Sequence, residues 1–291
     1  MRQNYLIVLL MVISIFSCKK EETEINYTDY VNVFIGTGGH GHTFPGPTLP
    51  HGMVQLSPDT RLEGWDACAG YYYEDSVIHG FTHTHLNGTG RGDFGDILFM
   101  PTKGDSELTM KQYCSTFSHD NEHASPGYYQ VLLDKYSINV ELTATYRAGM
   151  HRYTFPNTTG NKLVIDMGPT IHNHPHPFTE IEILNDSTVC GMKYTDGWAM
   201  NHYVYFYAEF SKPFDYELYS DTVVLSGQSS VQAETAKAVL SFKESVGNSE
   251  ESVVLAKVGI SAVDVEGAKR NLLNEIKGWD FDNVVNEAKR I

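Results

Sequence analysis

Basic residues are scarce in this sequence. Its 291 residues include 21 Lys and Arg against 36 Asp and Glu, which gives a formal net charge of −15 at pH 7. An acidic surface of this kind repels phosphate backbones, so we expect no nucleic acid partner. The same charge suits solubility and neutral ligands such as sugars, without by itself identifying either.

Cysteine is also rare, with four residues. Cys68, Cys114 and Cys190 are far apart and form no Cys-x-x-Cys or Cys/His pattern, so a structural zinc site is not predicted. Outside the cytoplasm one disulfide could form among them. The spacing does not select the pair.

A long apolar run is missing as well. The run from Tyr5 to Phe16 follows a basic start and is too short to span a bilayer as a helix. It is typical of a signal peptide, and Cys18 after a small residue resembles a bacterial lipoprotein cleavage site. We therefore predict a lipoprotein signal peptide at 1–18, lipidation of Cys18 and a charged tether at 19–27. An ordinary signal peptide with a chance cysteine is the alternative. The predicted location is the bacterial cell envelope, at the outer membrane, periplasmic or surface-exposed, with a lipid anchor in the membrane.

Regular periodicity is weak from 28 to 105, where Gly, Pro, His and Asp are abundant, and this favours ordered loops. From Gly127 onward short strand patterns follow one another with turn residues between them. We expect strands near 128–133, 137–146, 150–155, 162–167, 180–184, 188–194, 202–210, 215–219, 222–225, 236–242 and 252–260. The predicted fold class is all-β, a large antiparallel β-sandwich over 28–263 with C-terminal linker helices.

The last residues, 264–291, change to a helical period. Asp264 and Asp280 are candidate N-caps, and Gly278 can end the first helix. The second helix has an apolar stripe of Phe281, Val284, Val285, Ala288 and Ile291 that runs to the last residue. We expect this stripe to be exposed and to lead into a further domain. The alternative is a helix that docks back on the sandwich.

Three segments carry unusual motifs: 29–60 with a Gly/His/Pro run, 64–73 with Gly-Trp-Asp, and 80–96 with Phe-Thr-His-Thr-His-Leu. Glycine permits left-handed backbone and proline stiffens the path, so these are predicted to be rigid loops. No Gly-Lys-Ser/Thr follows the glycines, which argues against a phosphate-binding loop. Trp65, set among Gly and Asp, is predicted to be a partly exposed platform for the apolar face of a sugar ring rather than a core residue.

Histidines gather in these loops at His40, His42, His83 and His85. Loop histidines more often form hydrogen bonds, and the pattern specifies no third ligand, so no metal ligand is predicted. A second cluster lies within 172–177, where the prolines indicate an exposed extended loop. Asp59, Asp66, Asp93 and Asp96 can each cap a turn, and the sequence separates no acid from a base. No catalytic residue is predicted.

Together the three segments resemble glycoside hydrolase family 92, from about Asp29 to the end of the chain. In that family this part is an N-terminal β-sandwich joined by helices to an (α/α)6 barrel. The resemblance implies inverting exo-hydrolysis of α-mannosides, most commonly α-1,2-linked, as in N-glycan degradation. It also implies a calcium ion in the complete enzyme. The general acid Glu, the base Asp and most calcium contacts belong to the barrel, which this sequence does not include.

Carried onto this sequence, the resemblance implies that Trp65 and Asp66 line the leaving-group side of a mannose pocket. His83, His85 and Asn87 support or contact its rim. We therefore expect a domain that shapes the rim, binds a mannose-containing glycan, docks on the barrel and is inactive alone. The alternative is a free-standing surface carbohydrate-binding lipoprotein, and a weaker one is a purely structural scaffold.

Overall fold

The computed structural model describes residues 26–105, 108–156, 159–243 and 251–291. The predicted signal peptide, Cys18 and most of the tether lie outside these residues. The chain divides into two units, 1–30 and 31–291. In the first, the described residues form a short 3-10 helix, η2 (Tyr27–Tyr30), and Asn26 just before it accepts a hydrogen bond at Oδ1 from Thr28 N at 3.2 Å. No described helix is long and apolar enough to cross a bilayer.

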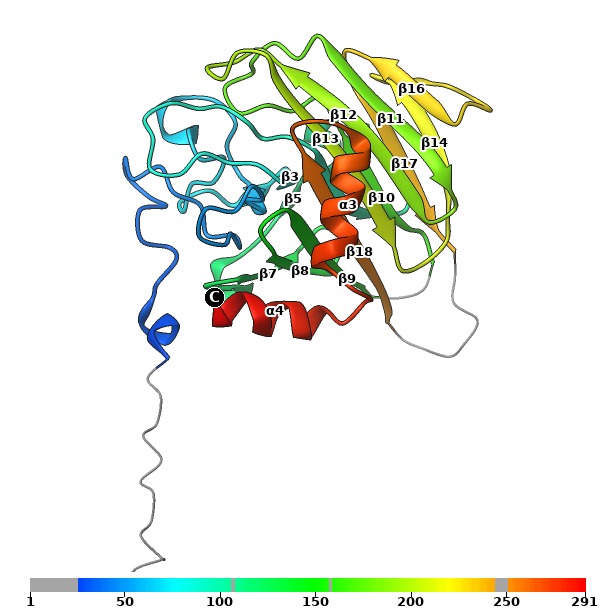
Figure 1. The fold of residues 1–291 in the computed structure, drawn as a ribbon. Coiled ribbons are helices and arrows are strands. Elements are labelled where there is room, and N and C mark those ends of the chain that lie inside the picture. The colour runs from blue at the N-terminus through cyan, green and yellow to red at the C-terminus, as the bar shows by residue number, and fades with distance from the viewer. Residues whose placement is uncertain (1–25, 106–107, 157–158, 244–250) are drawn as a thin grey trace, which may run out of the picture. The chain divides into compact units, whose positions relative to one another are not determined.

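The second unit is built around a sheet that has nine antiparallel strands in the described residues (Figure 1). In spatial order they are β16 (Ser230–Ala233), β11 (Phe178–Asn185), β12 (Thr188–Thr195), β13 (His202–Phe210), β18 (Ser252–Ser261), β9 (Ala148–Phe155), β8 (Ile138–Ala144), β7 (Tyr128–Leu133) and β6 (Glu122–Ser125). β18 pairs with both β13 and β9 and so joins two groups of consecutive strands.

A second antiparallel sheet has seven strands among the described residues. Their order is β1 (Ser57–Asp59), β3 (Gly80–Thr82), β4 (Leu98–Lys103), β10 (Asn161–Asp166), β17 (Ala236–Phe242), β14 (Phe214–Ser220) and β15 (Val223–Val224). A small third sheet pairs β2 (Val77–Ile78) with β5 (Ser115–Thr116). The remaining short elements are η3 (Trp65–Ala67), α2 (Met110–Tyr113) and η4 (His119–Asn121).

The main core lies between the two large sheets. Phe99 of β4 stacks with Phe210 of β13 at 6.2 Å between ring centroids, and Phe155 of β9 meets Phe242 of β17 at 6.4 Å. β7 buries alternate residues, as expected for a strand with one covered face. The all-β antiparallel sandwich that the sequence predicts is confirmed, with two helices at its C-terminal end.

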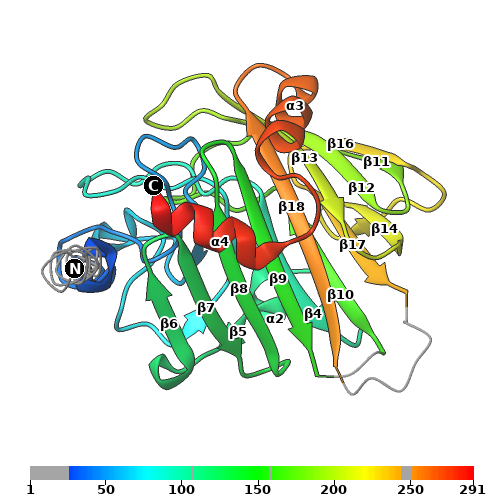
Figure 2. The ribbon, with the colours of Figure 1, turned by 60° about the horizontal axis from the view of Figure 1, so that its bottom comes forward.

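Those helices are α3 (Val265–Glu275) and α4 (Phe281–Arg290). Asp264 and Asp280 cap them as predicted, accepting hydrogen bonds from Gly267 N at 2.5 Å and Asn283 N at 3.0 Å. α3 packs on β18 and β13, whereas Figure 2 shows α4 lying across β7, β8 and β9.

The expectation of an exposed stripe on the last helix is wrong for four of its five residues. Phe281, Val284, Val285 and Ala288 are buried, and only Ile291 is exposed. The outer face of the nine-stranded sheet offers apolar residues such as Ala148 and Met150, and these cover the helix. The helix therefore docks back on the sandwich, as the alternative proposed.

The motif-rich segments form mostly loops, but they are not free of strands. β1 and β3 pair with each other and extend the seven-stranded sheet next to β4. His83 and His85 directly follow β3, and Trp65 begins η3. The edge of the sheet therefore anchors both ends of the loops that carry the candidate site residues.

Candidate functional site

Trp65 is an exposed aromatic side chain, as the sequence predicts, with 57% of its surface accessible. One edge of its ring rests on Gly90, where an added Cβ would lie 2.7 Å from the indole, so any larger residue at 90 would push the ring away. The His42 ring meets it edge-on at 5.0 Å between centroids. The indole is thus fixed in place while a large part of it stays open to solvent.

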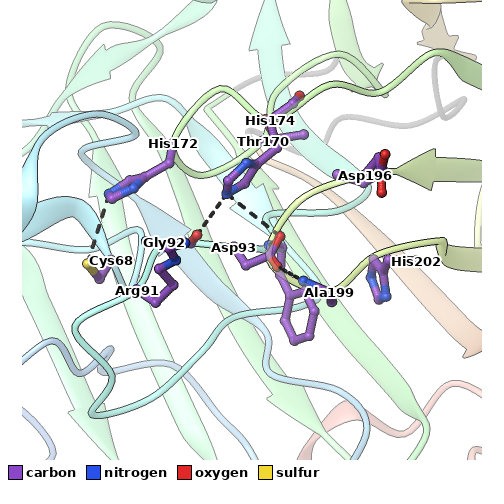
Figure 3. A network of polar contacts seen from close by, with 12 residues as sticks. Cys68, Arg91, Gly92, Asp93, Thr170, His172, His174, Asp196, Ala199 and His202 are labelled. Atoms are coloured by element: carbon purple, nitrogen blue, oxygen red, sulfur yellow. Dashed lines mark hydrogen bonds and ion pairs between the residues drawn. The ribbon is translucent and has the colours of Figure 1, made fainter.

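The loop under Trp65 is held from two sides. The Cys68 thiol donates to the Trp65 carbonyl at 3.1 Å, and the His172 ring hydrogen-bonds the Gly64 carbonyl at 2.9 Å. Figure 3 shows His172 reaching over from a separate loop toward Cys68. Cys68, Cys114 and Cys190 are all free thiols, so no disulfide forms among them.

Asp66, next to Trp65, meets the two histidines of the Gly/His/Pro run. Its Oδ1 lies 2.7 Å from His40 Nδ1 and 3.8 Å from His42 Nε2. The Asp66 side chain is 26% exposed, the His42 side chain is buried, and the His40 side chain is open to solvent. Sequence reasoning placed Asp66 at the site but did not connect it to these histidines, because the loops are more than twenty residues apart.

Asn87, the other predicted rim residue, is exposed on the loop that packs against the histidine run. The next residue, Gly88, donates its N–H to the His42 carbonyl at 2.6 Å. Asn87 also lines a cavity of about 290 Å³ together with Thr43 and Phe44. The structure therefore brings Trp65, Asp66 and the Asn87 loop together around His42.

His83 takes no part in this exposed cluster. It is fully buried, with Nδ1 bonded to the Ile97 carbonyl at 2.7 Å and Nε2 at 3.0 Å from His151 Nε2. Burial, together with the nearby His85, lowers the pKa of His83 to about 4 despite the Ile97 bond, and burial lowers the pKa of His151 well below its usual value. The resemblance implies that His83 either supports the rim of the pocket or contacts it. Its buried position fits the supporting role.

His85 is also buried and links β1, β3 and the segment before β1. Its Nε2 lies 3.0 Å from both Asp59 Oδ1 and Thr82 Oγ1, and Nδ1 bonds the Gln55 carbonyl at 2.7 Å. The side chain is fully buried, so it too is placed to support the rim from below.

Sequence reasoning missed a second polar network, built on Asp93 and Asp96. Asp93 accepts from Ala199 N at 2.6 Å and lies 4.0 Å from His174, which bonds the Gly92 carbonyl at 2.8 Å (Figure 3). The His172–His174 loop is therefore fastened to both the Trp65 loop and the Gly92 loop. The His-x-His spacing was the available signal, but it was interpreted as an exposed loop.

Asp96 is buried among groups that stabilise its charge. Burial would raise its pKa, but His202 at 3.0 Å, Lys193 at 3.7 Å and the Thr84 hydroxyl at 2.7 Å together lower it to about 2. Burial lowers the pKa of His202, but the hydrogen bond to Asp96 outweighs this effect and raises the pKa above the ordinary value. These groups hold the loops onto β12 and β13.

Four carboxylates of the motif region were considered as acid or base. Asp59, Asp93 and Asp96 are fully buried and engaged as described, which leaves Asp66 as the one with an accessible side chain. Two opposed carboxyl groups in an open cleft are what inverting glycosidases need. Among these four no such pair exists.

The exposed indole of Trp65 therefore lies beside polar groups on loops at one edge of an antiparallel β-sandwich, where an aromatic face could cover a flat apolar surface of a ligand. The sequence matches the glycosyl hydrolase family 92 N-terminal domain over residues 30–261, and the chain belongs to this family.

Known structures support the same assignment. A family GH92 alpha-mannosidase from Bacteroides thetaiotaomicron superposes with a TM-score of 0.85 at 35% identity, covering 91% of this chain and 36% of that one. A GH92 inverting mannosidase from Bacteroides thetaiotaomicron VPI-5482 superposes with a TM-score of 0.79 at 27% identity, covering 93% of this chain and 36% of that one.

A relative in sequence is an uncharacterized secreted glycosidase of Arthroderma benhamiae. It is 23% identical over 318 residues, which cover 99% of this chain and 40% of the relative. The chain thus spans about two fifths of the length of these relatives, between 36% and 40%.

Proposed function

We propose that this chain shapes one side of the mannose pocket of an inverting exo-α-mannosidase, with α-1,2-linked mannosides as the substrates. The observation that carries the proposal is the exposed, braced indole of Trp65 beside Asp66 in a domain of family 92. An aromatic face covers the apolar face of a sugar ring, while carboxylate and amide groups take its hydroxyls. Trp65, Asp66 and Asn87 contact the leaving-group sugar, and His83 and His85 hold their loops.

Bond cleavage in this proposal belongs to a part of the enzyme outside this chain, an (α/α)6 barrel on which the domain docks. The burial of Asp59, Asp93 and Asp96 supports this division, because a buried, hydrogen-bonded carboxylate cannot reach a glycosidic oxygen. We therefore expect the chain alone to release no mannose.

Calcium does not fit the one three-residue group of close side-chain donors that the described residues contain. That group is His40, His42 and Asp66, and two of its three donors are imidazole nitrogens. Ca²⁺ takes six to eight oxygen ligands. We assign the calcium of the complete enzyme to the barrel and route no step through it here.

The rival proposal, a free-standing carbohydrate-binding lipoprotein, draws support from α4, whose apolar face is covered within this chain. The two proposals predict different sugar affinities for the chain alone. A binding protein needs a complete pocket, whereas half of a pocket gives few contacts and leaves most of the sugar solvated. In either case we propose an envelope location; the relative from Arthroderma benhamiae is named as secreted.

The test uses the three tryptophans as reporters. α-1,2-Mannobiose is titrated into the chain with calcium present, while indole N–H signals are followed by NMR and free mannose is assayed. We expect the Trp65 signal to shift, with a dissociation constant weaker than about 1 mM, and no mannose to appear. Trp65→Ala should abolish the remaining sugar-induced shifts.

Trp198→Ala is the matched control, because Trp198 is equally exposed, at 58%, on the loop between β12 and β13. This variant should bind as the parent does. Release of mannose by the chain would overturn the proposed division of labour. Tight binding would favour the rival, and sugar-induced shifts that survive Trp65→Ala would remove Trp65 from the site.

A further inference from the structure

A buried nitrogen without a partner stands out in the histidine run. His42 Nε2 is shielded from solvent and has no hydrogen-bond partner among the described residues. Leaving such a group unsatisfied costs about 1–3 kcal/mol, so a partner is expected. The atom lies 3.8 Å from Asp66 Oδ1, which is too far for a hydrogen bond.

Two further donors converge on the same point. One ring nitrogen of His40, one ring nitrogen of His42 and an oxygen of Asp66 all lie within 4.8 Å of one another. Zinc holds histidine nitrogens and carboxylate oxygens at roughly 2.0–2.2 Å in a tetrahedral arrangement. The distances from Asp66 Oδ1 to His40 Nδ1 and His42 Nε2, 2.7 Å and 3.8 Å, lie on either side of the ligand spacing that this geometry requires. Small side-chain rotations would bring the three donors around one ion.

The loops that carry these donors are tightly held. His42 has a left-handed backbone, φ 53°, and its carbonyl accepts from Gly88 N. Gly41 lies against Gly36, where an added Cβ would be 2.2 Å from the Gly36 carbonyl oxygen, so the path between the two histidines is fixed. On the other side, Asp66 sits in η3, whose start His172 anchors through Gly64. The donors are therefore presented by the folded scaffold itself.

We propose that His40, His42 and Asp66 form a binding site for a first-row transition metal ion, with Zn²⁺ as the best-suited ion. The set of two imidazoles and one carboxylate is that of open zinc sites, in which a water or a substrate oxygen takes the fourth position. Here that position opens beside the Trp65 indole, which meets the His42 ring at 5.0 Å. A hydroxyl-bearing ligand over Trp65 would reach it.

Binding the ion would also join the histidine run to η3, two loops that are otherwise bridged at this point by the His40–Asp66 hydrogen bond. The inference does not rest on the proposed function, because metal binding is measured without sugar. Failure of either proposal leaves the other standing.

The experiment titrates ZnCl₂ into the tag-free chain by isothermal titration calorimetry. One ion should bind per chain, and CaCl₂ at millimolar concentration should not displace it. His42→Gln should weaken binding at least about tenfold, and His40→Gln and Asp66→Asn should do the same. X-ray absorption of the zinc-loaded chain should show nitrogen and oxygen neighbours near 2.0 Å.

His123→Gln is the control, because His123 is an exposed histidine on β6, away from the three donors in sequence and sheet. It should bind zinc as the parent does. Circular dichroism of each variant separates lost binding from lost folding. Absence of binding at 1 mM zinc, or equal binding by folded His42→Gln, would overturn the proposal.

Discussion

At the scale of single residues, the contact between His83 and His151 has a clear electrostatic meaning. Their Nε2 atoms are 3.0 Å apart in a fully buried site, so one ring must donate and the other accept. The second nitrogen of each ring is also engaged, at the Ile97 carbonyl for His83 and at the Tyr153 hydroxyl for His151. Protonating both rings would place two like charges together without solvent.

We expect the His83 ring to stay neutral well below the pH at which a histidine in an unfolded chain titrates. Its pKa is about 4 in the fold against 6.5 for the free group, so the unfolded chain binds more protons between these values. Folding stability is therefore fully present above pH 6.5 and falls as the pH drops from 6.5 toward 4, by about 3 kcal/mol for His83.

Nitrogen-15 NMR of the imidazole groups measures this directly between pH 4 and 7. The same protein unfolded in urea supplies the reference titration. A His83 signal that titrates near pH 6.5 in the folded protein would contradict the assignment.

The sequence predicts which residues lie at the exposed site around Trp65 better than it predicts their contacts. Trp65 is exposed and Asp66 adjoins it, as the Gly-Trp-Asp pattern indicates. The partners of His83 and His85 could not be foreseen, because His151 and Asp59 come from strands that only the folded sheets bring near them. The contact between His42 and Asp66 could not be predicted either, because the two residues are also far apart in the sequence.

At the scale of elements, α4 is held by its apolar face and by one arginine. Arg152 of β9 lies over the Phe281 ring at 4.3 Å and also pairs with Asp282 at 3.0 Å and Glu141 at 2.5 Å. The first residue of the helix is thus fixed by packing, cation–π contact and charge together.

Phe281→Ala should therefore lower the free energy of unfolding by about 3 kcal/mol, because it leaves a cavity beneath the helix and removes the surface on which Arg152 stacks. Urea unfolding measures the loss, and faster hydrogen exchange should be confined first to 281–290. Asn286→Ala, on the exposed face of the same helix, should change stability by less than about 0.5 kcal/mol. Equal effects of the two variants would show that the apolar face of α4 does not stabilise the fold.

Element prediction succeeded where one period dominates. The limits of β7, β13 and β17 agree with the expected ones, and those of β11, β12 and β18 nearly so. It failed at β3 and β4, because Gly80 and Pro101 weaken the strand pattern while the neighbouring strands supply the pairing. The strand predicted at 137–146 is β8, whose sequence alternates apolar and polar residues. Its burial hardly alternates, because α4 covers its outer face.

At the scale of the whole molecule, the predicted route of the protein through the cell depends on residues outside those described. If Cys18 is the lipidated residue, Cys18→Ala should abolish labelling by an alkyne palmitate analogue and leave a longer precursor that keeps residues 1–18.

Cys114→Ala is the matched control, since Cys114 is a free and partly exposed thiol in the folded unit. It should keep both the label and the processed length. Labelling that persists in Cys18→Ala would show that the chain is not lipidated at this residue.

The place of β18 in the nine-stranded sheet sets the order in which the protein can mature on the ribosome. Strands β6 to β9 and β11 to β13 are complete before residue 252 emerges, yet β9 and β13 lack a neighbour on their facing edges until β18 inserts between them. Two half-sheets with open edges therefore exist together from the completion of β13 at residue 210 until β18 emerges, at risk of pairing with other nascent chains. Ribosome release before residue 261 would leave both edges open, so chaperone demand should peak just before that point.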